Sequence, residues 1–332
     1  MPHCIALFSG GLDSCLSIIT LLRQGIKITA LYFDTHFGCG LGSRELYLKK
    51  ISDEFGFTME IVDVGSEFLE IVKKPAYGYG KNMNPCLDCK IMMLSKAGDY
   101  MRQVGADFIA TGEVVGQRPM SQQRHIFNMM EKRTALKGYI LRPLSATVLP
   151  PTYPEIRGMV DRSRLHGIVG RKRHQQFALA NEYGLKDYPS PSGGCLLTNP
   201  NYSLRLKELL SFKKDPDLRD LKLLKIGRHF RSPEGVKIIV GRNSADNDYL
   251  IGLSNEHDIV IQPLDTNGPN VVIPHTEVSD EVIKAGAGLC AYYSDGRYRD
   301  TIRVVVRRGD KENIVDARPD DAMTIHRYMI RL

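Results

Sequence analysis

The chain has 332 residues, of which 42% are hydrophobic and 25% are charged, and its formal net charge is +7. This is the composition of a soluble globular protein that can bury a core, and the length suffices for two domains. No segment approaches the ~18 consecutive apolar residues of a spanning helix, and Ile5–Phe8 is too short for the apolar part of a signal peptide. These features argue against a membrane-spanning or secreted protein, and we expect a cytoplasmic one.

The first half of the chain alternates short apolar runs with segments of helical periodicity. Short apolar runs predict strands, and apolar residues three or four apart predict helices. We predict strands at Cys4–Phe8, Ile28–Phe33, Thr58–Val62 and Phe108–Thr111, and helices at Leu12–Arg23, Arg44–Phe55 and Leu94–Val104. This order predicts an α/β fold, a Rossmann-like doubly wound parallel sheet covered by helices on both faces.

The second half has a different pattern. Leu141–Pro154 and Tyr188–Pro200 are rich in turn-forming residues and predict irregular connections. After the charged segment Ser211–Leu221, which we interpret as a linker, short apolar runs recur between turns, at Val236–Val240, Asp258–Gln262, Asn270–Ile273 and Thr301–Val306. We therefore predict one domain over residues 1–210 and a second, smaller α+β domain over residues 221–332.

A glycine turn joins the first predicted strand to the first helix. Its sequence is Ser9-Gly10-Gly11-Leu12-Asp13-Ser14. Glycines let the backbone approach an anion, and the N–H groups of the turn and the helix N-terminus form a positive pocket for phosphate. The hydroxyls of Ser9 and Ser14 add donors, and Asp13 can hold Mg²⁺. The segment lacks the Gly-Lys-Ser/Thr ending of a Walker loop, and a plain capped helix start is the structural alternative.

This turn resembles the SGGxDS signature of the PP-loop ATP pyrophosphatases. The resemblance implies their sheet fold and an activity that cleaves ATP between the α and β phosphates, adenylates the substrate and releases pyrophosphate. It further implies that Ser9, Gly10, Gly11, Asp13 and Ser14 bind the phosphates and Mg²⁺, with Asp13 as a catalytic residue, and that Phe33 lies near the adenine.

Three of the seven cysteines stand out. Cys86 and Cys89 have C-x-x-C spacing, and Cys195 lies in a glycine-rich loop. Three thiolates suit a [4Fe–4S] cluster with one open iron, whereas a closed zinc site needs a fourth ligand such as His174. The pattern resembles the cluster-dependent tRNA thiolases, which implies that Cys86, Cys89 and Cys195 are catalytic cluster ligands. A cluster-free route, with one cysteine carrying a persulfide and a second completing a disulfide, stays open, as does a purely structural role.

A polar stretch follows the fourth predicted strand. Ala110–Gln122 resembles the TGExxGQxxSQ segment of tRNA 4-thiouridine synthetases, and the carboxyl edge of a parallel sheet is where ligands bind. Thr111, Gly112 and Gln117 are our candidates for further contacts to the nucleotide or the target base; a simple loop is the alternative. The bacterial synthetases carry an RNA-binding region before the phosphate loop, and here that loop begins at residue 9, so the modified position in the RNA is not predicted.

Basic residues concentrate between Arg157 and Arg173. Such clustering favours a polyanionic partner, although a solvated helix face is the simpler interpretation. Between two candidate functional segments, it favours nucleic acid. The predicted RNA-binding residues of the first domain are Arg118, Arg164, Arg171, Lys172 and Arg173.

The second domain has a distinctive segment at Val240–Leu250, VGRNSADNDYL. It resembles the VGRNxxxND motif of the NFACT-R domain of ribosome quality-control factors, and Ile261–Ile273 is similar to that domain's second block, with Asn270 in place of a histidine. The resemblance covers residues 221–318 and implies RNA binding, with Arg242 and Asn243 as candidate contacts. A turn-building role for these polar residues is the alternative.

Together these features predict an ATP-dependent tRNA sulfurtransferase. ATP, Mg²⁺ and a [4Fe–4S] cluster are the expected cofactors, and tRNA and a sulfur donor, sulfide or a carrier persulfide, are the expected partners. Two other functions stay open. One is a PP-loop ligase or amidotransferase acting on a small metabolite, with the cysteines holding a structural metal. The other is an RNA-binding factor regulated by a nucleotide.

Overall fold

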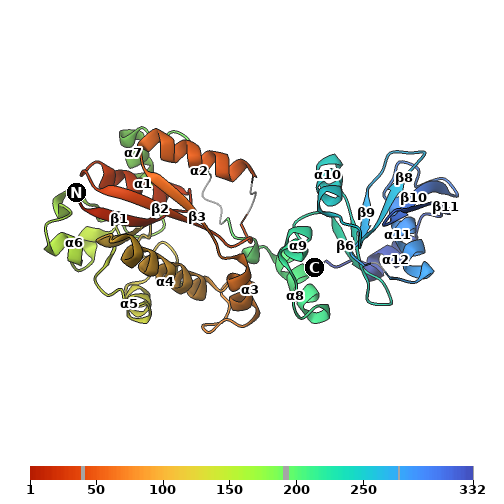
Figure 1. Cartoon of the computed structure of the whole chain (residues 1–332), viewed down its shortest axis with the longest axis horizontal. Coiled ribbons are helices and arrows are strands. Elements are labelled where there is room, and N and C mark those ends of the chain that lie inside the picture. Colours follow the sequence, from red (N-terminus) through yellow and green to blue (C-terminus); the bar gives the residue numbers. More distant parts are fainter. Residues whose placement is uncertain (39–41, 190–193, 276, 332) are drawn as a thin grey trace. The chain divides into compact units, whose positions relative to one another are not determined.

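The computed structural model describes residues 1–38, 42–189, 194–275 and 277–331 (Figure 1). Two compact units divide the chain, Met1–Thr198 and Asn199–Leu332. The predicted linker Ser211–Leu221 carries the end of helix α8 (Pro200–Phe212) and most of α9 (Leu218–Leu223), both in the second unit. Within the described residues, no helix is long and apolar enough to cross a membrane.

The first unit is built on a parallel five-stranded sheet in the order β3-β2-β1-β4-β5. The strands are β1 (His3–Leu7), β2 (Lys27–Asp34), β3 (Thr58–Asp63), β4 (Phe108–Thr111) and β5 (Ile140–Leu141). The helices are α1 (Leu12–Leu22), α2 (Gly42–Phe55), α3 (Gly65–Lys73), α4 (Cys86–Val104), α5 (Arg124–Arg133), α6 (Tyr153–Ile156) and α7 (His174–Tyr183). The predicted Rossmann-like parallel sheet is confirmed.

Helices cover both faces of this sheet. The chain winds outward from β1 to β3 and then returns to β4 and β5, so right-handed crossovers place the helices of the two halves on opposite faces. Accordingly α1, α2 and α7 cover one face, and α4 and α5 cover the other (Figure 1). Most residues of the central strands β1, β2 and β4 are apolar, because both faces of the sheet are buried. The order change between β1 and β4 opens the carboxyl edge at that point, where ligands bind in such folds.

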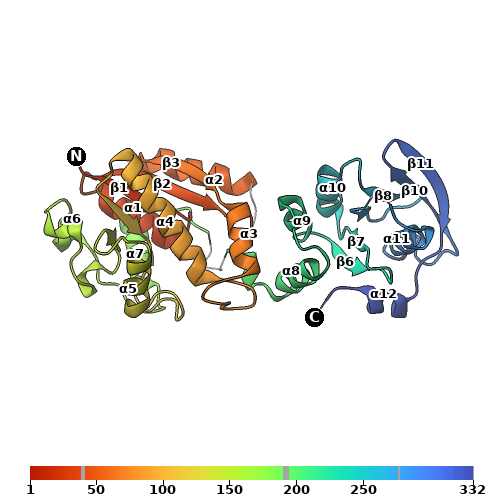
Figure 2. The same cartoon turned by 60° about the horizontal axis from the view of Figure 1, so that its bottom comes forward.

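The second unit holds an antiparallel six-stranded sheet in the order β11-β10-β8-β9-β7-β6. Its strands are β6 (Arg228–Arg231), β7 (Lys237–Val240), β8 (Ile259–Pro263), β9 (Val271–Ile273), β10 (Ile302–Arg308) and β11 (Lys311–Ala317). Besides α8 and α9 it contains α10 (Ser244–Leu253), α11 (Asp280–Tyr292) and α12 (Ala322–Tyr328), and Figure 2 shows the β10–β11 hairpin with α11 beside it. This is the predicted second, smaller α+β domain.

Alternate residues of the central strands pack into two separate cores. Ile238, Val271 and Ile261 belong to the cluster that includes α11 residues. Their neighbours Ile239, Val272 and Val260 pack with Leu250 of α10. Because side chains alternate across a strand, the sheet is buried on both faces.

Candidate active site

The phosphate loop runs from the end of β1 to the start of α1 and is already ordered by its own hydrogen bonds. The Ser14 hydroxyl donates to the Gly11 carbonyl at 2.8 Å, accepts from the Ser9 amide at 3.3 Å and lies 3.2 Å from the Ser9 hydroxyl. Gly10 has φ of +69°, and a Cβ there would lie 2.5 Å from Leu48 Cδ2. Only glycine fits this position, so the loop has the tight turn that the sequence predicts.

Asp13 is the first acidic residue of α1, and its two carboxylate oxygens differ. Gln117 Nε2 donates to Oδ2 at 3.0 Å, and an Arg173 guanidinium nitrogen lies 3.7 Å from the same oxygen. The other oxygen, Oδ1, is buried and has no hydrogen-bond partner among the described residues. A buried carboxylate oxygen without a donor is costly unless a cation or ligand satisfies it. Asp13 Oδ1 is therefore a suitable ligand for Mg²⁺, which binds through one or two carboxylates and the phosphates of its nucleotide.

The end of β4 packs against the phosphate loop. A Cβ on Gly112 would lie 2.6 Å from the Ser14 nitrogen and 2.7 Å from the Asp13 carbonyl oxygen, and the Ser17 hydroxyl donates to the Thr111 carbonyl at 3.2 Å. Gly112 thus supports the loop through its backbone. The structure therefore brings Thr111, Gly112 and Gln117 to Asp13, while Phe33 is buried in β2 near the same sheet edge.

The two cysteines of the C-x-x-C motif lie in the first turn of α4, which begins at Cys86. The helix predicted from Leu94 thus starts eight residues earlier, directly after its N-cap Pro85, and includes the whole C-x-x-C motif. One helical turn presents residues three apart on the same side. Both cysteines therefore lie on one helical turn.

Cys195 reaches these cysteines through backbone pairing. The amide of Leu196 donates to the Phe37 carbonyl at 2.8 Å, the Met83 amide donates to the Leu197 carbonyl at 3.2 Å, and Asn82 Nδ2 donates to the Thr198 carbonyl at 2.7 Å. The segment that follows Cys195 is thereby tied both to the end of β2 and to the segment before α4. Ser192 and Gly193, in the glycine-rich loop that precedes Cys195, lie outside the described residues.

The electrostatics of Cys89 reflect the gathering of the three thiols. Burial raises the pKa of the Cys89 thiol, Cys195 and Cys86 raise it further, and Lys90 lowers it. Several thiolates cannot share such a site without a cation to compensate their charge. Within the part of the chain that the structure describes, no three His, Cys, Asp or Glu side chains form a ready site for a single metal ion.

A buried ion network joins the cysteine helix to the end of β4. Lys90, directly after Cys89, forms an ion pair with Glu113. On the other side, Arg142 Nε donates to Glu113 Oε2 at 3.2 Å, and its NH1 donates to Glu131 Oε1 at 2.7 Å. Burial alone would raise the pKa of Glu113, but Lys90 and Arg142 outweigh it and hold that pKa below its usual value. The carboxylate is therefore charged and fixed beside the site.

Sequence reasoning did not identify Lys90, Glu113 or Arg142 as site residues. Glu113 stands within the quoted T-G-E segment, and Lys90 directly follows the second cysteine, so opposite charges next to two candidate motifs were the available signal. Arg142 carries no local signal, because it meets Glu113 only through the pairing of β4 with β5.

His36 is another residue that sequence reasoning missed, at the carboxyl edge of β2. Its φ is 60°, and its Nε2 lies 3.0 Å from each carboxylate oxygen of Asp63 at the end of β3. A Cβ on Gly65 would lie 1.9 Å from His36 Cδ2, so glycine is required there. A left-handed backbone conformation is uncommon for a histidine, and residues in such conformations cluster at functional sites. The signal in the sequence was Asp-Thr-His directly after a predicted strand.

The basic segment approaches the phosphate loop at its C-terminal end. Gly170 donates its amide to the Val115 carbonyl at 2.8 Å, which places the following residues beside the Gln117 segment. Arg171, Lys172 and Arg118 are exposed there, while Arg173 pairs with Asp13. Earlier in the run, Arg164 donates to the Arg23 carbonyl at 2.5 Å.

The conspicuous motif of the second unit maintains its own local structure. Arg242 Nε donates to Asp246 Oδ2 at 2.6 Å, and the Asn243 side chain caps α10 by accepting from the Asp246 amide at 2.9 Å. Asn270, in place of a histidine, donates its amide to Asn247 Oδ1 at 2.9 Å. RNA contact by Arg242 and Asn243 stays a prediction.

Comparison with known proteins agrees with these observations. Residues 2–147, which contain the phosphate loop, the C-x-x-C motif and the T-G-E segment, match the family model described as thiamine biosynthesis protein (ThiI). The first unit contains a ThiI-type PP-loop domain. Residues 227–329 match the family described as the NFACT protein RNA binding domain, so the resemblance of the second unit to NFACT-R is confirmed as well.

Curated relatives of the ThiI-type domain include tRNA-specific 2-thiouridylases. The enzyme of Sulfurimonas denitrificans is 33% identical over 114 residues, covering 32% of this chain and 33% of the relative. That of Dechloromonas aromatica is 26% identical over 200 residues, covering 55% of this chain and 54% of the relative. The chain thus spans between a third and about half of the length of these relatives.

Two solved structures are also similar to this chain. A 4-thiouridine synthetase–RNA complex with bound ATP has a TM-score of 0.39 at 21% identity, covering 68% of this chain and 52% of that one. The U34-tRNA thiolase NcsA of Methanococcus maripaludis, with its [4Fe–4S] cluster, has a TM-score of 0.34 at 19% identity, covering 64% of this chain and 67% of that one.

Proposed function

We propose that this protein is a cytoplasmic, ATP-dependent tRNA sulfurtransferase that converts a uridine of tRNA into a thiouridine. The observation that carries the proposal is the gathering of Cys86, Cys89 and Cys195 in the same unit as an ordered phosphate loop, with Lys90 and Glu113 connecting the two. Chemistry at a thiol site and at a nucleotide site in one domain is what sulfur transfer to an activated base requires.

In the first step the phosphate loop binds ATP. Its amides and the hydroxyls of Ser9 and Ser14 bind the phosphates, and Asp13 Oδ1 holds Mg²⁺ against them. Thr111, Gly112, Gln117 and Phe33 shape the nucleotide and base pocket around the loop. A carbonyl oxygen of the uridine attacks the α-phosphorus, pyrophosphate leaves, and N3 of the base gives up its proton. Arg173 and the metal stabilise the negative charge that develops on the phosphates.

In the second step a hydrosulfide attacks the ring carbon that carries the adenylated oxygen. AMP leaves with that oxygen, and the proton of the sulfur returns to N3, so the base ends as a neutral thiocarbonyl. The three cysteines fit a [4Fe–4S] cluster, because burial and the two neighbouring thiols raise the pKa of Cys89, and a cationic cluster would compensate the charge of its thiolate. The irons of a cluster are separate centres, so each of the three cysteines can bind a different iron. When bound, the cluster supplies an open iron for a sulfur ligand.

The exposed basic residues beside the loop are suited to the phosphate backbone of the tRNA. Arg118, Arg171 and Lys172 lie next to the Gln117 segment, and Arg164 lies earlier in the basic run. The NFACT-type unit, with Arg242 and Asn243 at the start of α10, is the second candidate RNA-binding surface.

The test uses anaerobically purified full-length protein, its iron and acid-labile sulfide measured first. It is incubated with unmodified tRNA, ATP, Mg²⁺ and sulfide, and the tRNA nucleosides and released pyrophosphate are quantified. Wild type should form a thiouridine. Cys195→Ser should lose thiouridine but keep tRNA-dependent pyrophosphate release, and Asp13→Ala should lose both. Pyrophosphate release with a small acid in place of tRNA, and no thiouridine with any tRNA, would refute the proposal in favour of a metabolite ligase.

A further inference from the structure

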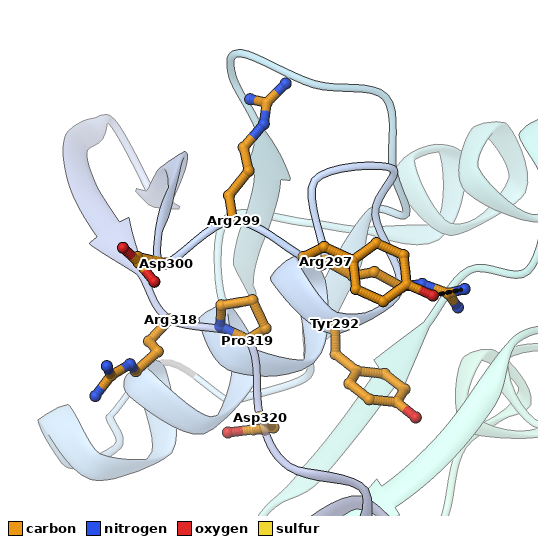
Figure 3. Close-up of a pocket in the computed structure, with 8 residues that line it drawn as sticks. Tyr292, Arg297, Arg299, Asp300, Arg318, Pro319 and Asp320 are labelled. Carbon is orange, nitrogen blue, oxygen red and sulfur yellow. Dashed lines mark hydrogen bonds between the residues drawn. The ribbon is translucent and has the colours of Figure 1, made fainter.

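The second unit contains a pocket of about 430 Å³ that is separate from the motif around Arg242 (Figure 3). It lies between the end of α11, the loop that follows it and the segment after β11. Tyr292, Arg297, Tyr298, Arg299, Arg318 and Asp320 contribute the side chains that matter here.

Backbone contacts fix the walls of this pocket. The Asp320 amide donates to the Gly288 carbonyl at 3.3 Å, and a Cβ on Gly288 would lie 2.5 Å from Asp320 Oδ1, so the segment after β11 packs directly on α11. In the opposite wall, the Gly296 amide donates to the Ser294 hydroxyl at 3.1 Å, and a Cβ on Gly296 would lie 2.6 Å from Ile302 Cγ2. The pocket is therefore preformed.

An exposed aromatic ring borders the pocket. Tyr298 is 85% exposed, and the Arg297 guanidinium lies 4.6 Å from the centre of its ring and donates to its hydroxyl at 2.5 Å. The arginine holds one ring face and the hydroxyl, so the tyrosine is oriented while most of its surface still faces solvent. An oriented, exposed ring beside cationic groups is the arrangement on which nucleic-acid bases stack.

The remaining arginines lie around the rim. Figure 3 shows Arg299 and Arg318 extending in different directions, and Arg299 approaches a carboxylate, that of Asp265, only at 4.0 Å. Guanidinium groups spread in this way match successive phosphates of a strand better than the clustered phosphates of one free nucleotide. Asp320, on the floor of the pocket, offers acceptors for a base amino group or a ribose hydroxyl.

The net charge of the whole second unit bears on how the arginines around the pocket can act. Residues 199–332 contain 21 Lys and Arg against 20 Asp and Glu, so the unit has almost no net attraction for a polyanion. RNA binding by this unit therefore depends on local clusters of cationic and aromatic groups.

We infer that this pocket binds one unstacked nucleotide of a single-stranded RNA segment, with its base on Tyr298 and the flanking phosphates on Arg299 and Arg318. The inference rests on the proposed action on tRNA and specifies where and how the second unit contacts RNA.

The test measures binding of the full chain to a fluorescent 12-nucleotide oligo(U) and to a duplex of equal length by anisotropy. Tyr298→Ala should weaken binding of the single strand about 5- to 100-fold, the cost of one lost base stack, whereas Tyr298→Phe should bind nearly as well as wild type. Arg318→Ala should weaken binding and lower the slope of log K against log salt concentration by about 0.7, the value for one phosphate contact to a single strand. Phe212→Ala and Lys284→Ala, exposed residues outside both the pocket and the Val240–Leu250 motif, are the matched controls and should have no effect.

Several outcomes would overturn the inference. They are wild-type affinity in Tyr298→Ala and Arg318→Ala, an equal loss in the control variants, a preference for the duplex, or full displacement of the RNA by equimolar UMP, which would indicate a free-nucleotide site. Circular dichroism spectra of the variants exclude misfolding as a cause of lost binding. Thiouridine formation by the wild type is scored separately, so failure of the sulfurtransferase proposal and failure of the pocket are distinguishable.

Discussion

The buried carboxylate of Glu113 gives the sharpest test of how the cysteine helix is coupled to the phosphate loop. Glu113 is 9% exposed and Arg142 is 3% exposed, and Lys90 pairs with the same carboxylate from α4. Replacing Glu113 by Gln keeps the shape and a hydrogen-bond acceptor but removes the charge that compensates two cations.

The expected cost follows from the exposure of the partners. Removing one partner of a buried ion pair costs about 3–5 kcal/mol when the remaining charge is left uncompensated. Here Arg142 keeps Glu131, at 2.7 Å, and the Lys90 side chain is 23% exposed, so water meets part of its charge. We therefore expect Glu113→Gln to lower the free energy of unfolding by about 2–3 kcal/mol at pH 7, measured by urea unfolding of the full chain.

The pH dependence of this loss has a definite sign. Because the pKa of folded Glu113 is lowered, its contribution is present above the unfolded pKa and is lost as the pH falls through the folded pKa. The stability difference between wild type and Glu113→Gln should therefore shrink below about pH 4, the usual range for a glutamate.

The matched control is Glu131→Gln, which removes one ion pair of Arg142 but leaves the Lys90–Glu113 pair intact. Both variants should lose stability, but only Glu113→Gln should reduce thiouridine formation more than it reduces tRNA-dependent pyrophosphate release, because only it releases the residue next to Cys89. Equal loss of both activities in the two variants, or a change in stability below about 0.5 kcal/mol for Glu113→Gln, which is typical of ordinary surface substitutions, would refute the reasoning.

Three further predictions concern the loop and the pocket. Gly112→Ala should reduce pyrophosphate release about 100-fold, because a Cβ there displaces the backbone of Asp13 and Ser14; Gly80→Ala, with only ordinary contacts, should not. Gln117→Leu should raise the Mg²⁺ concentration for half-maximal pyrophosphate release about 10-fold, because the Gln117 side chain orients the Asp13 carboxylate. Asp13→Asn should raise that concentration further. Unchanged Mg²⁺ dependence in both variants would contradict the assignment of Asp13 as the Mg²⁺ ligand. Burial, aided by the neighbouring Asp321, raises the pKa of Asp320 to about 6. Ionisation of Asp320 therefore destabilises the folded state increasingly as the pH rises from about 4 to 6. Allowing for the partial exposure of Asp320, Asp320→Asn should raise the free energy of unfolding by about 1–2 kcal/mol at pH 7.5 but not at pH 4, as measured by calorimetry.

The parallel sheet and the phosphate loop were predictable because their signals are local. β1, β2 and β4 are short apolar runs buried on both faces, and the left-handed backbone at Gly10, with φ of +69°, is announced by the Gly-Gly pair itself. In the second sheet, the buried strands β7 to β10 were predicted from their apolar runs, whereas β6 and the largely exposed β11 were not.

What could not be predicted depends on contacts between distant segments. Cys195 reaches the cysteine helix through hydrogen bonds of Asn82 and Met83 to residues more than a hundred positions later, and no periodicity encodes them. Helix α7 was hidden because its start adjoins the basic run, which we interpreted by charge alone. Arg142, which completes the ion network, lies in a segment that we expected to be irregular.

The central claim is that the base carbonyl oxygen of a tRNA uridine is adenylated before sulfur replaces it. The most direct measurement uses tRNA transcribed with uridine labelled with ¹⁸O at both carbonyls, incubated anaerobically with the full-length protein, ATP, Mg²⁺ and sulfide. Mass spectrometry of the AMP and of the nucleosides follows. The account predicts one ¹⁸O atom in the AMP for each thiouridine formed. Thiouridine accompanied by unlabelled AMP, or AMP formed without thiouridine, would contradict it.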